Sequence, residues 1–294
     1  AFVFPGQGAQ FVGMGKDLYD NIPEAKELFE RANEILGFRI TDIMFAGTDE
    51  ELKQTRVTQP AIFLHSVILA KSLGAAFVPD MAAGHSLGEF SALVATGALS
   101  FEEGLKLVSK RALAMQRACE INPSTMAAVL ALPDETVERI CAETEGVVVP
   151  ANYNCPGQLV LGGEKAAVDA ASALAKEKGA RRCLPLKVSG PFHTPLMAPA
   201  GDALAERFRT VEFREPQIPV IFNCLGAERP DGAAIPELLV RQVQSSVYME
   251  DSLRRMAAMG LDALVEIGPG KALSGFVKKT VPELPVYAVE TAAE

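Results

Sequence analysis

The stretch GHSLG, at residues 84–88, decides the fold of this chain. It has the pattern G-x-S-x-G and lies between a predicted buried strand at 81–85 and a predicted helix at 86–96. A serine in that setting sits on a sharp strand-to-helix turn, which only small neighbours allow. The helix that starts there points unpaired backbone N–H groups at the serine, so the N–H of Leu87 is a natural donor to an oxyanion. The stretch therefore indicates an α/β fold with Ser86 as its nucleophile.

The regions on either side of this turn alternate between strands and helices, which is typical of an α/β protein. The middle of the chain differs, because its elements follow the order βαββαβ of a ferredoxin-like unit. We therefore predict an α/β-hydrolase-like large subdomain, formed by residues 1–119 and 194–294, with a ferredoxin-like small subdomain at 120–193 inserted into it. Outside the turn, strands are predicted at 2–4, 126–132, 147–153, 159–161, 183–188, 220–223 and 263–267, and helices at 24–36, 59–73, 101–119, 134–143 and 165–178.

The composition is that of an ordinary soluble globular protein, with 49% apolar and 22% charged residues in a chain of 294. No apolar run is long enough to span a bilayer, and the opening AFVFPGQGAQ has neither the basic segment nor the cleavage site of a secretory signal. Since the chain does not start with Met, we expect a few further residues upstream. A net charge of −9 argues against nucleic-acid binding, because no basic stripe could neutralise a run of phosphates.

Cysteine and histidine usage argues against a metal site. The five cysteines are scattered without a CxxC pair, and there are only three histidines, so no zinc site is expected. An odd, scattered set of thiols indicates a reducing, cytoplasmic environment. The acidic composition does not indicate an oligomer, and we expect a monomer.

A serine hydroxyl needs a base, and the candidates are His65, His85 and His193. His65 lies within the helical pattern IFLHSVIL and is most simply a core or flanking residue. His85 directly precedes the serine, so we expect its side chain to point to the opposite face of the strand. By elimination the best candidate is His193, which follows a predicted strand at the exit from the small subdomain.

Seven short segments, spread along nearly the whole chain, carry a more specific signal than the turn alone. They are FVFPGQGAQ (2–10), TQPA (58–61), GHSLGE (84–89), SKRALAMQ (109–116), ANYNCPGQLVLGG (151–163), GPFHTPLM (190–197) and EIGPGKALSG (266–275). In this order they resemble the malonyl-CoA:acyl-carrier-protein transacylases, a family that includes the acyltransferase domains of fatty-acid and polyketide synthases.

The resemblance implies a role for individual residues. Ser86 would be the nucleophile and His193 its base. The oxyanion would be held by the backbone N–H groups of Leu87 and Gln7. The backbone carbonyl of Gln242 would orient the histidine, so that no carboxylate is needed as the third member of a triad.

The helical position of Arg111 bears separately on the substrate. Arg111 lies three residues after Val108 and four before Met115, so it borders the buried face of its helix. An arginine there is either half of a structural ion pair or a clamp for a ligand carboxylate, and the resemblance favours a clamp for malonyl. Phe192 and Leu87 stand where methylmalonyl-selective relatives usually carry Ser and often carry Gln. A bulky Phe192 would crowd an α-methyl branch, a discrimination typically worth ~1–3 kcal/mol.

The implied reaction moves a malonyl group from malonyl-CoA to the phosphopantetheine thiol of an acyl carrier protein, in fatty-acid or polyketide biosynthesis. The coenzyme A thioester is a substrate, and no metal or redox cofactor is implied. Acyl carrier proteins are typically acidic, so docking on this acidic chain needs a local basic patch. Ordinary solvated charge is the alternative interpretation of every candidate. The candidates are Arg181, Arg182 and Lys187 near the subdomain junction, and Lys271, Lys278 and Lys279 in the C-terminal part.

Two other functions remain open from the residues. A serine esterase or thioesterase would use the same turn with water as acceptor, although it has no need for a buried guanidinium at Arg111. A non-catalytic module that docks carrier proteins would keep the fold, although intact Ser86, His193 and Arg111 argue against it. The length of the chain favours a stand-alone enzyme over a domain cut from a synthase.

Overall fold

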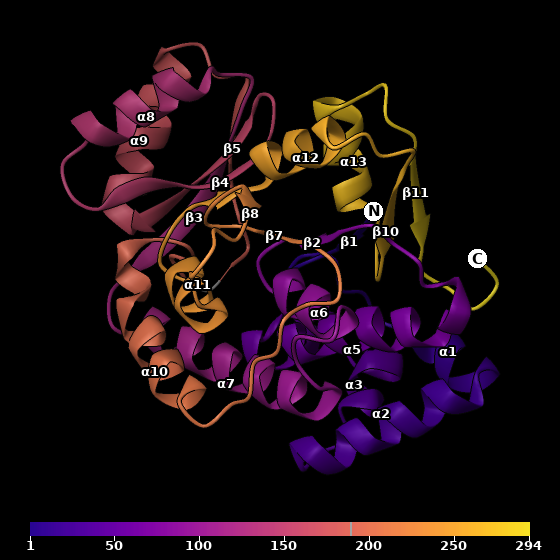
Figure 1. The fold of residues 1–294 in the computed structure, drawn as a ribbon. Coiled ribbons are helices and arrows are strands. Elements are labelled where there is room, and N and C mark those ends of the chain that lie inside the picture. The colour runs from indigo at the N-terminus through magenta and orange to yellow at the C-terminus, as the bar shows by residue number, and fades with distance from the viewer. Residues whose placement is uncertain (189) are drawn as a thin grey trace.

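The computed structural model describes residues 1–188 and 190–294, and its larger sheet lies at the centre of the molecule (Figure 1). The neighbouring strands of this sheet are parallel, except that β8 runs antiparallel to β7. Parallel pairing brings the carboxyl ends of β1 and β2 to one edge, where open α/β sheets bind their ligands. In order across the sheet the strands are β11 (Val286–Val289), β10 (Leu264–Ile267), β1 (Phe2–Phe4), β2 (Ala82–Gly84), β7 (Val220–Phe222) and β8 (Ala227–Glu228).

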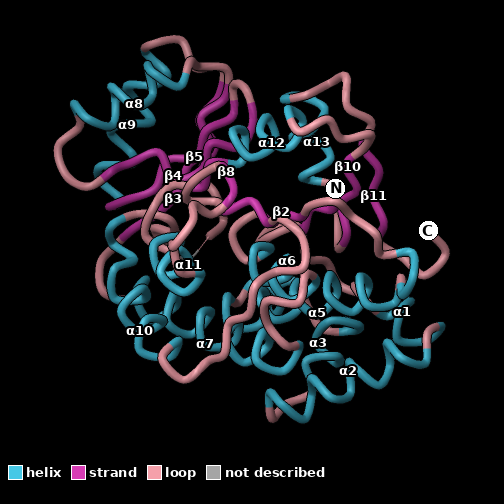
Figure 2. Tube along the Cα trace, in the orientation of Figure 1, coloured by secondary structure: helices cyan, strands magenta, loops and turns pink. Residues whose placement is uncertain are grey.

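Helices cover both faces of this sheet. Figures 1 and 2 show α5 and α6 on one side and α12 and α13 on the other. Successive strand residues point to opposite faces, so Phe4 belongs to the apolar core under α5 and α6, and Val3 to the core under α12 and α13. The helices of this part are α1 (Lys16–Asn21), α2 (Pro23–Leu36), α3 (Ile40–Ala46), α4 (Asp49–Lys53), α5 (Thr55–Ser72), α6 (Gly88–Ala95), α7 (Phe101–Cys119), α10 (Ala198–Phe208), α11 (Ile235–Gln242), α12 (Met249–Ala258) and α13 (Ala272–Thr280), with short 3₁₀ turns at Gly74–Ala76 and Pro195–Met197.

A second sheet, with its own apolar core, lies at the upper left of Figure 1 beside α8 (Asp134–Glu143) and α9 (Lys165–Glu177). Its first four strands pair antiparallel, and their spatial order follows from the βαββαβ connectivity that the sequence predicts. The fifth strand, β9, comes from the C-terminal part and was not expected. In order across the sheet the strands are β6 (Arg182–Pro185), β3 (Ser124–Leu130), β5 (Gln158–Glu164), β4 (Val148–Cys155) and β9 (Val247–Tyr248).

The division into two subdomains stays a proposal. The two separate sheets support an insertion at 120–193 into the part formed by 1–119 and 194–294. The pairing of β9 with β4 is the exception, because it joins the C-terminal part to the second sheet. No helix within the described ranges combines the length and the apolarity that crossing a membrane requires.

The predicted elements are present, but several of their ends differ. The strand predicted at 81–85 is Ala82–Gly84, and the helix predicted at 86–96 begins at Gly88. The helix starts late because Ser86 has a φ of +53°, which a right-handed helix cannot contain. The strand predicted at 183–188 is Arg182–Pro185, since only those residues pair with β3.

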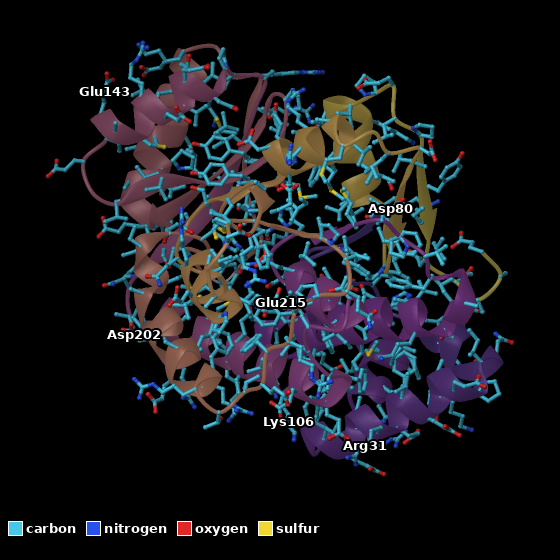
Figure 3. The ribbon with its side chains drawn as sticks, in the orientation of Figure 1. Arg31, Asp80, Lys106, Glu143, Asp202 and Glu215 are labelled. Carbon is cyan, nitrogen blue, oxygen red and sulfur yellow. The ribbon has the colours of Figure 1, made fainter. Side chains whose placement is uncertain are left out.

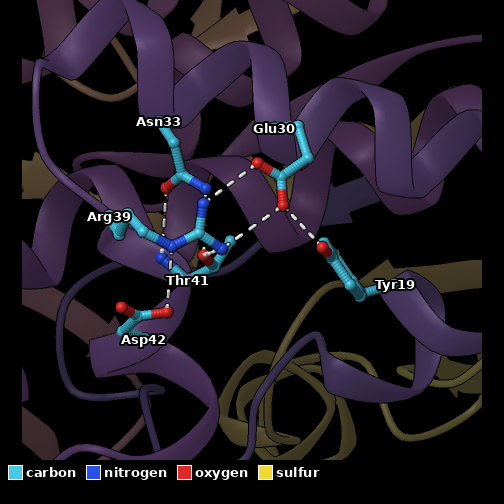
Figure 4. Close-up of polar contacts among 6 residues, drawn as sticks. All are labelled: Tyr19, Glu30, Asn33, Arg39, Thr41 and Asp42. Carbon is cyan, nitrogen blue, oxygen red and sulfur yellow. Dashed lines mark hydrogen bonds and ion pairs between the residues drawn. The ribbon is translucent and has the colours of Figure 1, made fainter.

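A group of polar and charged side chains joins α1, α2 and α3 (Figure 4). Arg39 donates to Glu30 at 3.1 Å and to Asp42 at 3.2 Å, and Tyr19 donates to Glu30. The Arg39 side chain is about half exposed, with 53% of its surface accessible to solvent. We call this group the α1–α3 cluster; it comprises Tyr19, Glu30, Asn33, Arg39, Thr41 and Asp42.

Candidate active site

The serine of the GHSLG stretch lies on the turn between β2 and α6. Its φ of +53° is a left-handed conformation, which a residue other than glycine keeps only when its surroundings hold it there. A Cβ atom at Gly84 would come within 1.9 Å of the backbone of Gly88, and one at Gly88 within 2.1 Å of the carbonyl oxygen of Phe4. Both glycines are therefore sterically required, which explains the pattern G-x-S-x-G around Ser86.

His193 is the histidine that faces this serine. Its Nε2 lies 2.7 Å from the Oγ of Ser86, and its Nδ1 lies 2.8 Å from the backbone carbonyl oxygen of Gln242. Because a carbonyl oxygen can only accept, Nδ1 carries the proton and Nε2 is free to accept the proton of the Ser86 hydroxyl. The imidazole is thus held in the tautomer that a general base needs.

Burial keeps this imidazole neutral. The side chain of His193 is almost inaccessible to solvent. Burial first, and then the positive charge of nearby Arg111, lower the pKa of His193 from 6.5 to about 3. His193 is therefore unprotonated, and able to accept a proton, well below neutral pH.

Arg111 reaches the same hydroxyl from helix α7. Its Nη2 donates to the Oγ of Ser86 at 3.1 Å and to the side-chain oxygen of Gln242 at 2.9 Å. Its Nη1 donates to the side-chain oxygen of Gln59 at 2.7 Å. The Arg111 side chain is fully buried, whereas Lys106 on the same helix lies at the outer edge of the molecule (Figure 3).

No carboxylate neutralises this guanidinium among the residues that the structure describes, and its Nε has no hydrogen-bond partner. The acid that affects its charge is Glu89, whose pKa is raised by burial to about 8, so that it is protonated at neutral pH. Burial lowers the pKa of Arg111 only to about 10, so the guanidinium stays charged. A buried charge without a counter-ion is unfavourable, and an anionic ligand would remove that penalty.

The backbone N–H groups of Gln7 and Leu87 remain available near the hydroxyl. Gln7 lines the same cavity as Ser86, and Leu87 leads directly into the N-terminus of α6. Throughout residues 1–188 and 190–294, neither N–H donates to another protein group. Free N–H groups beside a helix N-terminus are suited to stabilising the negative charge of a tetrahedral intermediate.

The hydroxyl opens into a cavity of about 280 Å³, which Phe192 and Lys187 also line. We expected His85 to point to the other face of its strand, but it borders this cavity too, and its Nε2 lies 2.8 Å from the Oδ1 of Asn154. The alternation of side chains along the strand ends before this point, because Ser86 has left the extended conformation.

Comparison with known proteins shows the family. Residues 1–293 match the acyl transferase domain family. The chain belongs to the acyl transferase family. The malonyl CoA-acyl carrier protein transacylase of Bacillus subtilis is 44% identical over 293 residues, which make up 98% of this chain and 92% of that protein.

Solved structures resemble this acyl transferase over its whole length. A crystal structure of an acyl carrier protein S-malonyltransferase from Vibrio cholerae is 42% identical, with a TM-score of 0.95 over 99% of this chain and 97% of the other. A structure described as a type II PKS acyl-carrier protein in complex with its malonyl-transacylase is 38% identical, with a TM-score of 0.95 over 99% of this chain and 96% of that one.

The acyl transferase fold brings together most of the residues selected from the sequence. Ser86, His193, Arg111 and Gln242 form one hydrogen-bonded group. His65 is buried away from it and pairs with the carbonyl oxygen of Glu290, as expected of a core histidine. The basic residues considered for carrier-protein docking are exposed and lie outside the hydrogen-bonded group; they are Arg181, Arg182, Lys187, Lys271, Lys278 and Lys279.

Three buried polar residues of this acyl transferase centre are not among those predicted from the sequence: Gln59, Glu89 and Asn223. Gln59 and Glu89 lie within the segments TQPA and GHSLGE, so both were visible as parts of short motifs. Asn223 directly follows β7, at the carboxyl end of a parallel strand next to β2, and that position is the signal that could have found it.

Proposed function

We propose that this chain is a malonyl-CoA:acyl-carrier-protein S-malonyltransferase, which carries the malonyl group as an ester of Ser86. One observation supports this most strongly. The hydroxyl of Ser86 donates to a neutral imidazole and accepts from a buried guanidinium that has no carboxylate partner among the described residues. A nucleophile and a place for a free carboxylate therefore coincide, and malonyl-CoA carries a thioester and a carboxylate separated by one methylene group.

In the first half-reaction, Nε2 of His193 takes the hydroxyl proton while Oγ of Ser86 attacks the thioester carbonyl. The N–H groups of Leu87 and Gln7 donate to the oxyanion that forms. The intermediate collapses, the carbon–sulfur bond breaks, and the imidazolium returns its proton to the leaving thiolate of coenzyme A. The product is the malonyl ester of Ser86.

In the second half-reaction, the phosphopantetheine thiol of the carrier protein loses its proton to His193 and attacks the ester. The carbon–oxygen bond breaks, and Ser86 regains its proton from the imidazolium. Because the malonyl group arrives and leaves as a thioester, this chemistry calls for neither a metal nor an electron carrier. The transfer supplies malonyl units to fatty-acid or polyketide synthesis, and the odd, scattered set of five cysteines supports a reducing, cytoplasmic setting.

Selectivity would follow from two side chains at the reaction centre. Arg111 offers N–H groups to the malonyl carboxylate, which an acetyl group lacks. Phe192 lines the cavity beside Ser86, so a branched methylmalonyl group would meet its ring. Discrimination by bulk alone is worth only ~1–3 kcal/mol, so we expect methylmalonyl-CoA to react slowly and not to be excluded.

We propose that Arg181, Arg182 and Lys187 receive the acidic carrier protein, because Lys187 lines the cavity that leads to Ser86. The competing patch is Lys271, Lys278 and Lys279. The double variants Arg182→Glu/Lys187→Glu and Lys278→Glu/Lys279→Glu separate them. Substitution of the patch that binds the carrier protein should raise KM for the carrier protein and leave acylation by malonyl-CoA unchanged. Unchanged kinetics in the first variant would remove Arg182 and Lys187 from the docking surface.

Intact mass spectrometry tests the function directly. The protein is mixed in turn with malonyl-, methylmalonyl- and acetyl-CoA, and Ser86→Ala is treated in parallel. We expect a stable malonyl adduct on the parent, a slower methylmalonyl adduct, little acetyl adduct, and none on Ser86→Ala. Rapid release of free malonate without a lasting adduct would favour the esterase alternative, and the absence of any acylation would favour a non-catalytic docking module.

A further inference from the structure

The backbone of Ser86 is held by a side chain that the mechanism above does not use. Oδ1 of Asn223 accepts the backbone N–H of Ser86 at 2.7 Å, and Nδ2 of Asn223 donates to the carbonyl oxygen of Gly84 at 2.5 Å. One amide thus bonds to the turn on both sides of residue 85. Oδ1 also accepts from Nε2 of Gln242 at 3.2 Å, which links it to the group that orients His193.

Asn223 is itself fixed in place. It follows β7, the strand that pairs with β2, and it is fully buried. Its backbone N–H donates to Oε2 of Glu89 at 2.7 Å, and its backbone carbonyl accepts the N–H of Tyr248 at 2.9 Å. Asn223 is the first residue of the turn that follows β7, and these two backbone hydrogen bonds fix its position.

The turn needs such a support because it is strained. A residue other than glycine at a φ of +53° costs on the order of 1–3 kcal/mol and persists only where the surroundings determine it. The carbonyl oxygen of Ser86 accepts from Nε2 of Gln242 at 2.8 Å, and the N–H of Ser86 is taken by Asn223. Both backbone groups of the strained residue are thus bound by buried amides.

We propose that Asn223 is a positioning residue, which holds the Oγ of Ser86 in line with Nε2 of His193 and Nη2 of Arg111. Asparagine suits this position because it offers an acceptor to the Ser86 N–H and a donor to the Gly84 carbonyl at once. Aspartate keeps the acceptor and loses the donor, and alanine loses both. This inference rests on the proposed role of Ser86 as nucleophile.

The test measures how fast Ser86 is acylated, separately from how many molecules are active. Asn223→Ala and Asn223→Asp are mixed with malonyl-CoA in a rapid quench, and the burst of malonyl adduct is followed by intact mass. Positioning predicts a full burst amplitude with a rate constant about 10²-fold lower in Asn223→Ala, since misplacement by about 1 Å costs that much. Asn223→Asp should fall between it and the parent. Inactivation of Ser86 by phenylmethylsulfonyl fluoride, which carries no carboxylate, should slow in parallel.

Asn33→Ala is the matched control. Asn33 is a buried asparagine in the α1–α3 cluster whose side chain both donates and accepts a hydrogen bond, in each case with Thr41, and it does not border the cavity. We expect it to lower the melting temperature and leave the acylation rate constant unchanged. The burst amplitude is measured against total protein and falls when part of the sample is unfolded, whereas the rate constant does not depend on that fraction. A poorly folding Asn223→Ala therefore still yields a rate constant, and Asn223→Asp provides an independent measurement.

Two results would overturn the inference. One is a reduced amplitude with the parental rate constant in both Asn223 variants, which a merely structural residue would give. The other is slower malonyl transfer with unchanged sulfonyl fluoride inactivation, which would place Asn223 in substrate binding. A parent protein that forms no adduct would contradict the proposed function instead, so the two failures are distinguishable.

Discussion

Two arginines show how differently the same side chain is used in two regions of this molecule. Arg39 has an exposed side chain in the α1–α3 cluster and is paired with Glu30 and Asp42. Arg111 is fully buried beside Ser86 and has no carboxylate partner in the described part of the chain. Arg39 lowers the pKa of Glu30 to about 2, as expected of an acid beside a cation. The acid next to Arg111, Glu89, shifts the other way and stays protonated at neutral pH, because burial outweighs the attraction.

The presence or absence of a carboxylate partner distinguishes the structural charge of Arg39 from the proposed ligand-binding charge of Arg111. An exposed ion pair is complete within the protein and contributes little to stability. A buried cation whose counter-ion is missing is destabilising, and this supports the proposal that a ligand carboxylate pairs with Arg111. Substitutions around Ser86 should therefore affect activity far more than substitutions in the α1–α3 cluster.

The largest loss is expected for His193→Ala. Removing the base leaves the Ser86 hydroxyl without an acceptor for its proton, and positioned general bases contribute about 10²–10⁴-fold. The measurement is the burst rate constant for the malonyl adduct, with Ser86→Ala as the blank. A rate within threefold of the parent, as an order-of-magnitude limit, would show that another group accepts the proton.

The next effect is expected for Arg111→Ala and concerns selectivity. Losing the partner of a desolvated carboxylate costs about 2–5 kcal/mol, so kcat/KM for malonyl-CoA should fall by about 30-fold or more. Acetyl-CoA has no carboxylate and should lose much less, so the ratio of acetyl to malonyl adduct should rise. Arg111→Lys keeps the charge without the fork and should fall between. A malonyl preference that survives in Arg111→Ala would contradict the clamp.

Much of this centre could be predicted from the sequence, because short contiguous segments carry most of the signal. The GHSLG stretch carries a recognisable pattern, in which Gly84 is required by a backbone contact within the turn and Gly88 by the carbonyl oxygen of Phe4 on the neighbouring strand. His193 was reached by elimination among three histidines. Asn223 was not selected, because its partners are 137 and 139 positions away and its place at the carboxyl end of a predicted strand was the one local signal.

Prediction of the fold was likewise limited to elements that have a local sequence pattern. The βαββαβ order was readable from local patterns, whereas β9 was not, because two residues at 247–248 are too few to show the alternation of a strand. They become a strand by pairing with Asn152 and Tyr153, and the ring of Tyr248 stacks on Tyr153 at 5.2 Å. Long-range pairing, and not local propensity, decides such elements.

A smaller effect on the rate constant for acylation is expected from a change in pH. Since burial lowers the pKa of His193 to about 3, the base stays neutral at pH 5.5, where an ordinary histidine would be about 90% protonated. The rate constant for acylation should change by less than about twofold between pH 7.5 and 5.5. Acetyl-CoA is the better probe, because it has no carboxylate to titrate. A roughly tenfold fall with a midpoint near 6.5 would contradict the buried, neutral imidazole.

The lowered pKa of His193 also determines whether the free energy of unfolding rises or falls with pH. The unfolded chain binds a proton at His193 below pH 6.5, whereas the folded chain does not until about pH 3. The stability that this residue contributes is therefore present above pH 6.5 and is lost as the pH falls through that window. His193→Gln should flatten the acid side of the curve of unfolding free energy against pH, and an unchanged slope would contradict the assignment.

The smallest effect is expected for Arg39→Ala in the α1–α3 cluster. Its ion pairs are exposed and screened by salt, so the melting temperature should drop slightly at low ionic strength, with the difference shrinking in 1 M NaCl. Acylation by malonyl-CoA should be unchanged. A loss of malonyl preference in this variant would remove the contrast between the two arginines.

The central claim is that the malonyl ester of Ser86 outlives the departure of coenzyme A and then passes to a second thiol. The direct measurement isolates the acylated protein, removes coenzyme A, and follows the adduct by mass after adding either buffer or holo acyl carrier protein. We predict that the adduct persists in buffer and moves to the carrier protein within a single turnover. An adduct that hydrolyses equally fast with and without the carrier protein would contradict the account.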